Sequence, residues 1–240
     1  MPEPFLSIVV PAYNEAGRLT SSLEAIQRYV QSKPFTIETI VVDDGSTDAT
    51  VEIASRQADI HVLRNVRNRG KGFSVRRGVL QARGELVLFT DADLSAPIEE
   101  ADKLLEAMES SHADAVVGSR ALRRELIGTH QSPFREWGGR FFNLMVRMLT
   151  GLHIHDTQCG FKLFRLETTR RAFELQRVDR FGFDPEILFL VQRLGGKVEE
   201  VPVRWNHNPA TKVHYLRDSI HMTLDLVMLR WRGFTGRYRT

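Results

Sequence analysis

Residues 37–54 have the sequence IETIVVDDGSTDATVEIA. The apolar run Ile37–Val42 is typical of a buried strand, and after the acidic turn Ser46 or Thr47 can cap a helix. Strands that alternate with helices in this way predict an α/β fold with a mostly parallel sheet flanked by helices. Comparable apolar runs recur at Leu6–Val10, Ile60–Leu63, Glu85–Thr90 and Ala113–Gly118.

The spacing of apolar side chains predicts the helices. Leu19, Leu23, Ile26 and Val30 fall on one helix face after the first strand. In the second half of the chain we expect helices over 134–151, 184–195 and 214–232, and a strand over Val198–Trp205. Because no linker or low-complexity tract interrupts the chain, residues 1–240 are expected to form a single domain.

The residues from about 205 to 240 are expected to form a basic amphipathic C-terminal element. Six cations outnumber two carboxylates there, and apolar side chains recur among them. This combination suits an anionic bilayer surface, and it equally suits a helix packed on the core with a solvated basic tail. The cations are Lys212, Arg217, Arg230, Arg232, Arg237 and Arg239, the carboxylates are Asp218 and Asp225, and the apolar residues are Met222, Leu226, Leu229 and Phe234.

The composition excludes several classes of protein. Hydrophobic residues make up 42% and charged residues 26% of the 240 residues, which is the balance of a globular protein. Cys159 is the only cysteine, so neither an intrachain disulfide nor a cysteine-rich zinc site can form. The net charge of +3 is too small to indicate a nucleic-acid partner. Because the first ten residues have no signal-peptide pattern and no window of about 18 apolar residues occurs, we expect a cytoplasmic protein.

Two aspartates follow the apolar run that ends at Thr90. Asp91 and Asp93 stand at positions i and i+2, and an extended chain turns such side chains to the same side. Neighbouring carboxylates repel each other unless a cation or a proton lies between them, and oxygen ligands suit Mg²⁺ or Mn²⁺ that bridges substrate phosphates. A helix cap in a solvated turn would account for the pair equally well.

Further polar stretches lie where predicted strands end. The stretch PAYNE (11–15) offers Tyr13 for stacking on a ring and Glu15 as an acceptor for a base. The stretch VVDDGSTD (41–48) has more acceptors than a helix cap needs, which fits recognition of base or sugar groups. Ordinary turn and capping chemistry is also compatible with both stretches.

Three other stretches have candidate chemistry. NRGKG (68–72) places positive charge before a helix, where phosphate can bind, but it matches neither the GxGxxG nor the P-loop pattern. Cys159, in DTQCGFKLF (156–164), is expected to be a small buried residue rather than a nucleophile. Asp184 and Glu186 are explained by the dipole at a predicted helix start, and they would be the leading bases if the acceptor were a hydroxyl group.

In combination, these stretches resemble glycosyltransferase family 2. The series PAYNE, VVDDGSTD, NRGKG, DAD (91–93), GSR (118–120) and DTQCGFKLF extends over nearly the whole chain. The resemblance implies a GT-A fold, which is the fold of nucleotide-diphospho-sugar transferases, and an inverting transfer. The later motifs, with Trp205 and Lys212, are most similar to polyprenyl-phosphate sugar synthases, and within that group to dolichyl-phosphate β-glucosyltransferases.

The resemblance also implies roles for single residues. Asp91 and Asp93 would hold Mg²⁺ or Mn²⁺ and, with the phosphate-facing Arg120 and Arg135, would form the catalytic set. The acceptor side would contain Gln158, Lys212 and Arg140. The positions that bind the nucleotide sugar would be Pro11, Ala12, Tyr13, Glu15, Asp43, Asp44, Gly45, Lys71 and Ala92.

The expected reaction moves one glucose from UDP-glucose to a polyprenyl or dolichyl phosphate, with the protein peripheral at the cytoplasmic face of a membrane. A phosphate monoester has a second pKa of about 6, so this acceptor needs cations more than it needs a general base. The QxxRW signature of processive polysaccharide synthases does not occur, which argues against chain elongation. The alternatives are GDP-mannose as donor, a soluble sugar as acceptor, and a non-catalytic nucleotide-binding module.

Overall fold

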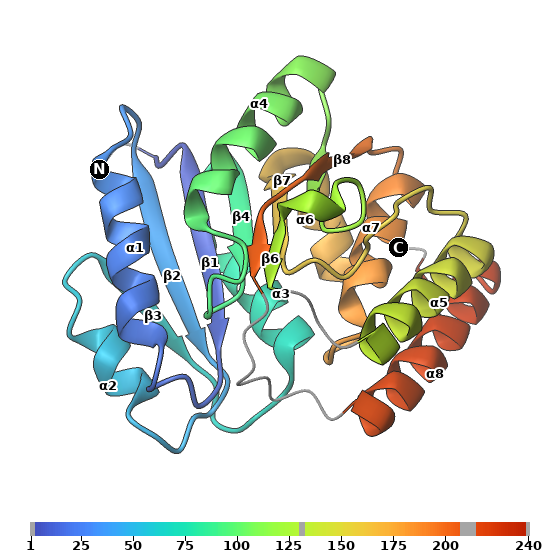
Figure 1. Ribbon diagram of the computed structural model, residues 1–240, viewed down its shortest axis with the longest axis horizontal. Helices are drawn as coiled ribbons and strands as arrows, with labels where there is room; N and C mark the ends of the chain where they lie inside the picture. The colour runs from blue at the N-terminus through green and yellow to red at the C-terminus, as the bar shows by residue number, and fades with distance from the viewer. Residues whose placement is uncertain (1–2, 130–132, 207–214, 239–240) are drawn as a thin grey trace.

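The computed structural model describes residues 3–129, 133–206 and 215–238. The strands are β1 (Leu6–Ala12), β2 (Ile37–Asp43), β3 (Ile60–Arg64), β4 (Leu86–Thr90), β5 (Ala115–Ser119), β6 (Ile127–Thr129), β7 (Phe161–Arg165), β8 (Val198–Pro202) and β9 (Trp205–Asn206). Within the described residues they form a seven-stranded sheet of order β3-β2-β1-β4-β7-β5-β8 and a two-stranded sheet of β6 and β9 (Figure 1).

Strand direction brings several chain segments to one edge of the large sheet. All its pairings are parallel except those of β7, which runs antiparallel to β4 and β5. Ala12 pairs with Asp43 in the register, so β1 and β2 end together, and β4 ends at the same edge. Because β7 runs the opposite way, it begins at this edge, where Phe161 lies opposite Thr90. The segments after β1, β2 and β4 therefore meet the segment that precedes β7.

Helices cover both faces of the large sheet (Figure 1). One face packs against α1 (Leu19–Gln31), α2 (Thr50–Ser55) and α4 (Ala101–Ser111). The other packs against α3 (Lys71–Gln81), α6 (Leu166–Leu175) and α7 (Phe183–Arg193), and α5 (Pro133–Thr150) and α8 (Tyr215–Phe234) add to the same core. Two short 3-10 turns, η1 (Ile98–Glu100) and η2 (Arg124–Leu126), complete the described elements.

The two cores explain the apolar runs of the sequence. Alternate side chains of a strand point to opposite faces, so Val9 belongs to one core and Ile8 and Val10 belong to the other. Strands that are buried on both faces need apolar side chains at nearly every position, which is typical of parallel sheets covered by helices. The predicted α/β architecture is thus confirmed.

Some local expectations were wrong. The helix after β2 begins at Thr50, later than Ser46 or Thr47, because the Ser46 hydroxyl instead accepts a hydrogen bond from the Asn14 backbone N–H at 2.8 Å. The N-cap residue is Ala49, and Asp48 orders the start of the helix by accepting a hydrogen bond from the Thr50 backbone N–H at 3.0 Å. The strand expected over 198–205 is divided into β8 and β9, and β7 and α6 were not predicted.

The helices expected in the second half of the chain are present as α5, α7 and α8. Among the described residues, no helix combines the length and the apolar character that crossing a bilayer requires.

Candidate active site

The turn after β2 is ordered by buried Asp43. Its carboxylate accepts hydrogen bonds from the backbone N–H groups of Gly45, at 3.1 Å, and Ser46, at 3.2 Å. Gly45 has a φ of +75°, and a Cβ there would lie 2.6 Å from the Arg67 carbonyl carbon. Only glycine fits a position with that conformation and that close an approach of backbone. Asp43 and Gly45 therefore shape the turn at the edge of the sheet.

Asp44 orders the loop that carries Lys71. Its side chain is 4% exposed, and it accepts hydrogen bonds from the backbone N–H groups of Arg69, at 2.9 Å, and Gly70, at 2.8 Å. Asn65 Nδ2 donates a further bond to it at 2.8 Å. Both carboxylate oxygens of Asp44 thus have partners within the chain, and its predicted role as an acceptor for a ligand remains a prediction.

The segment after β1 lies directly against the β2 turn. The Asp44 backbone N–H donates to the Ala12 carbonyl at 2.8 Å, and Asn14 Oδ1 accepts a bond from the Thr47 backbone N–H at 2.8 Å. Pro11 and Ala12 belong to β1, and Tyr13 is 36% exposed beside them. The residues predicted to hold the nucleoside are thus brought together at one edge, and their role remains a prediction.

Glu15 is buried and positions Arg18, an arginine for which sequence reasoning predicted no role. The Glu15 carboxylate accepts hydrogen bonds from Arg18 Nε and, at 3.0 Å, from Arg18 Nη2. Arg18 Nη1 is buried and lies 3.5 Å from Asp93 Oδ2, and among the residues that the structure describes it has no hydrogen-bond partner. A cation directly before the first turn of α1 is disfavoured by the helix dipole. A positive charge at this unfavourable position is the feature of the sequence from which a functional role of Arg18 could have been predicted.

Asp91 and Asp93 lie at the end of β4, each beside a cation. Lys71 Nζ lies 2.6 Å from Asp91 Oδ1, and Asp93 Oδ1 accepts a bond from the Ser95 backbone N–H at 3.0 Å. The side chain of Ala92, between them, is buried in the core shared with α1 and α4 rather than directed at the edge. Residues 92 and 93 form a turn rather than the extended chain that the i, i+2 argument assumed, yet both carboxylates act on the charges of Arg18 and Lys71. Their joint role as metal ligands remains a prediction.

Gly160 fits closely against Asp91 from the neighbouring strand. A Cβ at Gly160 would lie 2.1 Å from Asp91 Oδ2, and the Asp91 backbone N–H donates to the Gly160 carbonyl at 3.1 Å. The glycine before β7 therefore leaves the space that the Asp91 carboxylate occupies.

Lys71 is kept charged by its neighbours. Burial disfavours its ammonium form, but the carboxylates of Asp91 and Asp184 outweigh that effect and raise the pKa of Lys71. Its Nζ also lies 5.1 Å from the centre of the Phe89 ring. A fixed positive charge therefore stands next to the two aspartates at neutral pH.

Asp184 and Lys162 form a buried ion pair that was not predicted from the sequence. Lys162 is fully buried on β7 and donates to the Cys159 carbonyl at 2.6 Å and to Asp184 Oδ1. Burial raises the pKa of Asp184 in spite of the attraction of Lys162 and Lys71. This carboxylate thus belongs to the interior and not to the exposed part of the site.

Two other polar residues of the second half have structural roles. Glu186 is fully buried and accepts hydrogen bonds from the backbone N–H groups of Val178, at 2.7 Å, and Arg177, at 3.0 Å, and from the Tyr238 hydroxyl. It is therefore not placed to act as a base. Cys159 is buried as expected, and burial raises the pKa of its thiol to about 12.

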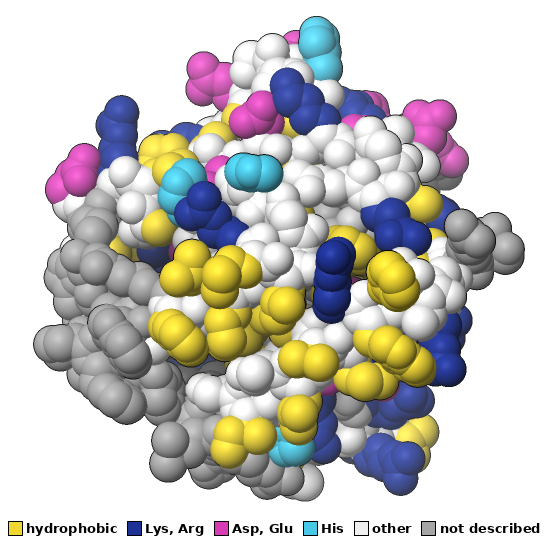
Figure 2. Space-filling model, turned by 90° about the vertical axis from the view of Figure 1, so that its right-hand side faces the viewer, with side chains coloured by type: hydrophobic (Ala, Val, Ile, Leu, Met, Phe, Trp, Pro, Cys, Tyr) yellow, Lys and Arg dark blue, Asp and Glu magenta, His cyan; other side chains and the backbone are white. Residues whose placement is uncertain are grey.

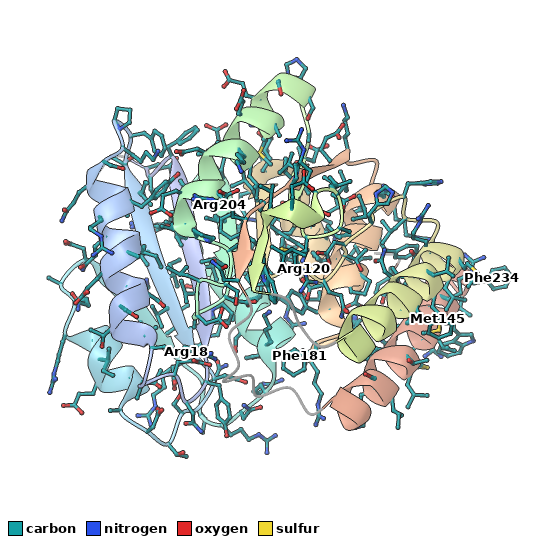
Figure 3. All side chains as sticks on the ribbon, in the orientation of Figure 1. Arg18, Arg120, Met145, Phe181, Arg204 and Phe234 are labelled. Atoms are coloured by element: carbon teal, nitrogen blue, oxygen red, sulfur yellow. The ribbon has the colours of Figure 1, made fainter. Side chains whose placement is uncertain are left out.

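Arg120 is engaged by Asp156. Its Nε and Nη2 donate to the Asp156 carboxylate at 2.7 and 2.8 Å, and its guanidinium lies 5.2 Å from the centre of the Trp205 ring. Burial acts against the charged form of Asp156, yet Arg120 lowers the pKa of Asp156 below its usual value. Figure 3 shows Arg120 beside β6. The predicted phosphate-facing arginine is present near the edge, with a carboxylate holding its orientation.

The predicted acceptor residues are only partly described. Gln158 is half-buried, and its Nε2 lies 3.9 Å from Met222 Sδ of α8. Arg135 and Arg140 belong to α5, but their side chains lie outside the described part of the chain, as does the whole of Lys212.

The donor set at the edge fits a divalent cation shared with a diphosphate. Within the described ranges, no group of three or more His, Cys, Asp or Glu side chains could hold an ion alone. Mg²⁺ is commonly bound through one or two carboxylates together with substrate phosphates, which is the set that Asp91 and Asp93 offer. The buried Arg18 Nη1 has no acceptor within the described part of the chain, so it adds beside them a hydrogen-bond donor that suits an anionic ligand.

Comparison with known proteins decides the family. A family model described as glycosyl transferase family 2 matches residues 7–173. The chain belongs to this family. It is 39% identical to a dolichyl-phosphate beta-glucosyltransferase of Drosophila melanogaster, over 98% of this chain and 77% of that protein. The identity to the Homo sapiens protein of the same name is 34%, over 99% of this chain and 78% of that one. The resemblance inferred from the motifs is confirmed, and this family member is a glycosyltransferase.

Solved structures agree on the fold, which is GT-A. The glucosyl-3-phosphoglycerate synthase of Mycobacterium tuberculosis, crystallised with Mn²⁺ and uridine-diphosphate-glucose, has a TM-score of 0.71 to this chain. The likeness covers 95% of this chain and 79% of that one at 19% sequence identity, so it concerns the fold alone.

Proposed function

We propose that this glycosyltransferase moves one glucose from UDP-glucose to the phosphate of dolichyl or another polyprenyl phosphate, at the cytoplasmic face of a membrane. The observation that carries the proposal is the 34–39% identity to dolichyl-phosphate beta-glucosyltransferases, over at least 94% of this chain. Similarity of that extent includes both the donor-side motifs and the segment before β7.

The charges at the edge support a nucleotide diphosphate as donor. Asp91 and Asp93 would hold a divalent ion, Mg²⁺ or Mn²⁺, which when bound offsets the negative charge of the leaving diphosphate. Lys71 is already charged there, and the described residues leave Arg18 Nη1 without a hydrogen-bond acceptor. Ala12, Tyr13 and Asp43 would line the nucleoside side of the same edge.

The state of the buried carboxylates supports an anionic acceptor. Asp184 forms an ion pair with Lys162. The Glu186 carboxylate accepts hydrogen bonds from two backbone N–H groups and from the Tyr238 hydroxyl. A hydroxyl acceptor would need a general base, whereas a phosphate monoester is largely dianionic at neutral pH. Arg120, Arg135, Arg140 and Lys212 would offset the repulsion between the two phosphates, and Gln158 would lie on the acceptor side.

A donor panel tests this function. The purified chain is incubated with polyprenyl phosphate, Mg²⁺ or Mn²⁺, and radiolabelled UDP-glucose, GDP-mannose or UDP-N-acetylglucosamine, and label is counted in the organic phase. We expect transfer from UDP-glucose and its loss on chelation of the metal. Label from GDP-mannose alone, or no label in the organic phase with any donor, would contradict the proposal.

Asp91→Asn tests the role of the aspartates. Removing the charge that holds the cation is expected to lower the transfer rate more than about a hundredfold. Asp59→Asn is the matched control. Asp59 is exposed and directly precedes β3, so it lies at the opposite edge of the sheet. A wild-type rate in Asp91→Asn would refute the assignment.

A further inference from the structure

Helices α5 and α8 expose large apolar side chains along one face. On α5, Phe141, Leu144 and Met148 are spaced i, i+3 and i+7, and Met148 is 69% exposed. On α8 the exposed apolar residues recur over four turns, and Phe234 is 85% exposed. We name these residues together the α5–α8 face; on α8 they are Ile220, Leu224, Val227, Met228, Trp231 and Phe234.

The opposite sides of the same helices are fixed to the protein core. Phe142 and Val146 of α5 and Leu226 and Leu229 of α8 are buried in one cluster. Gly233 lets α8 approach closely, because a Cβ there would lie 2.9 Å from Phe189 Cζ. The exposed stripe is therefore a second apolar side on helices that already bury the first, and folding of the chain leaves it open to solvent.

Positive charges accompany the apolar stripe. Arg147 and Arg230 are exposed beside it, and the Arg237 guanidinium lies 4.1 Å from the centre of the Trp231 ring. Among the side chains described on the two helices, Asp225 is the sole carboxylate, and it points inward at Gly182. Figure 2 shows hydrophobic side chains gathered on this side of the molecule, with Lys and Arg between them.

We propose that the α5–α8 face docks on an anionic lipid bilayer. Apolar side chains at this spacing, flanked by arginines, match a helix pair that lies in the headgroup layer. A patch of this size is more than the isolated apolar residues of an ordinary surface. A second copy of the chain fits less well, since it would bring the arginines of both copies into one desolvated interface, where Asp225 is the sole described carboxylate of the two helices and points inward.

Helix α8 connects this face to the predicted acceptor side of the site. Met222 of α8 contacts Gln158, and Asp225 of α8 contacts Gly182, so α8 links the face to the segments before β7 and α7. The docking proposal rests on the proposed function in one respect: the proposed acceptor is a lipid, and such a lipid lies in a membrane. The docking itself needs neither donor nor acceptor.

Vesicle sedimentation tests the proposal without substrate. The full chain is spun down with vesicles of phosphatidylcholine alone and of phosphatidylcholine with phosphatidylglycerol. We expect binding to the anionic vesicles and little to the neutral ones. Leu224→Glu with Phe234→Glu, and separately Met148→Glu, should each lower the partition coefficient at least about tenfold, since each glutamate replaces an apolar group that would leave water.

Val66→Glu is the matched control, because Val66 is a fully exposed apolar residue in the segment between β3 and α3, outside this face. It should bind as the wild type does, and circular dichroism should show all variants folded. Wild-type protein that stays in the supernatant with anionic vesicles would overturn the proposal. Glutamate variants that bind vesicles like the wild type would also overturn it. The same holds if gel filtration shows that the wild type is a dimer and that the glutamate substitutions convert it to a monomer without changing vesicle binding.

The two proposals fail in distinguishable ways. Transfer to polyprenyl phosphate dispersed in detergent, without vesicle binding, would overturn the docking and leave the function standing. Vesicle binding that depends on the α5–α8 face, without transfer to any polyprenyl phosphate, would support the docking and overturn the function.

Discussion

Gly160 and Asp91 show how closely two distant parts of the chain fit at the scale of single residues. Asp91 follows β4 and Gly160 precedes β7, and the close approach leaves no room for a side chain between them. The hydrogen bond from the Asp91 backbone N–H to the Gly160 carbonyl also fixes the backbone of Asp91. The orientation of Asp91 is thus set by a neighbouring strand as well as by Lys71.

Gly160→Ala is expected to displace the Asp91 carboxylate. A Cβ at 2.1 Å cannot be accommodated, and a shift of about 1 Å in a reacting group can cost on the order of a hundredfold in rate. We expect the transfer rate to fall by about that factor while the chain stays folded. Gly139→Ala is the control, because nothing lies within 4 Å of its added Cβ. Equal rates in the two variants would contradict this account.

Asp184→Ala is expected to destabilise the fold strongly. It leaves the fully buried Lys162 ammonium without its carboxylate, and breaking a buried pair in this way costs about 3–5 kcal/mol. Glu52→Ala breaks the exposed pair with Arg56 and should cost less than about 1 kcal/mol. Urea unfolding measures both, and similar free energies of unfolding for the two variants would count against the burial argument.

At the scale of elements, strands with unbroken apolar runs were predictable, and β7 was not. Its sequence FKLFR contains Lys162, which interrupts the apolar run and is typical of a solvent-exposed position. The lysine is buried because Asp184, on a helix much later in the chain, supplies its counter-charge. The residues around Lys162 contain no pattern that predicts a distant carboxylate as its partner. The strand β7 and its antiparallel direction could therefore be found only from the structure.

The same reason limits what could be predicted of the site. The i, i+2 spacing of Asp91 and Asp93 drew attention to the end of β4, and the motifs identified the family. Asp44 binds backbone N–H groups of the loop before α3, and Arg18 reaches Asp93 from the start of α1. Those contacts join segments that only the folded sheet brings together.

Helix α8 is expected to be part of the folded domain rather than a detachable tail. Leu229 is 1% exposed in the core shared with α7, so Leu229→Ala should lower the free energy of unfolding by about 2–5 kcal/mol. Leu224→Ala, on the exposed side of the same helix, should change it by less than about 0.5 kcal/mol. Urea unfolding followed by circular dichroism gives both values. A Leu229→Ala variant as stable as Leu224→Ala would show that α8 unfolds separately.

At the scale of the whole molecule, Asp156 connects three parts of the second half. It binds Arg120 after β5, and its backbone N–H donates to Glu200 of β8 at 2.8 Å. The segment that leads into β7 is thus tied to two neighbouring strands through charged groups. The stability of this half should therefore depend on pH.

Acidification is expected to weaken the fold through Asp156. Burial opposes its charged form, but Arg120 holds its folded pKa below the ordinary value of about 4, so the unfolded chain binds the proton more readily. The contribution of the pair is complete above that ordinary pKa and is lost as the pH falls through the folded pKa. Between neutral pH and about pH 3, the free energy of unfolding should fall less steeply in Asp156→Asn than in the wild type. Parallel slopes would contradict this expectation.

The reversed direction of β7 bears on how such enzymes diversify. The excursion between β5 and β7, which includes α5, leaves the sheet and returns to it between strands that stay in place. An insertion, deletion or graft within that excursion that spares the segment around Gly160 leaves the turns after β1, β2 and β4 untouched. Under the proposed function, exchanging this excursion would change the preferred acceptor, while the turns proposed to bind the nucleotide sugar would be kept.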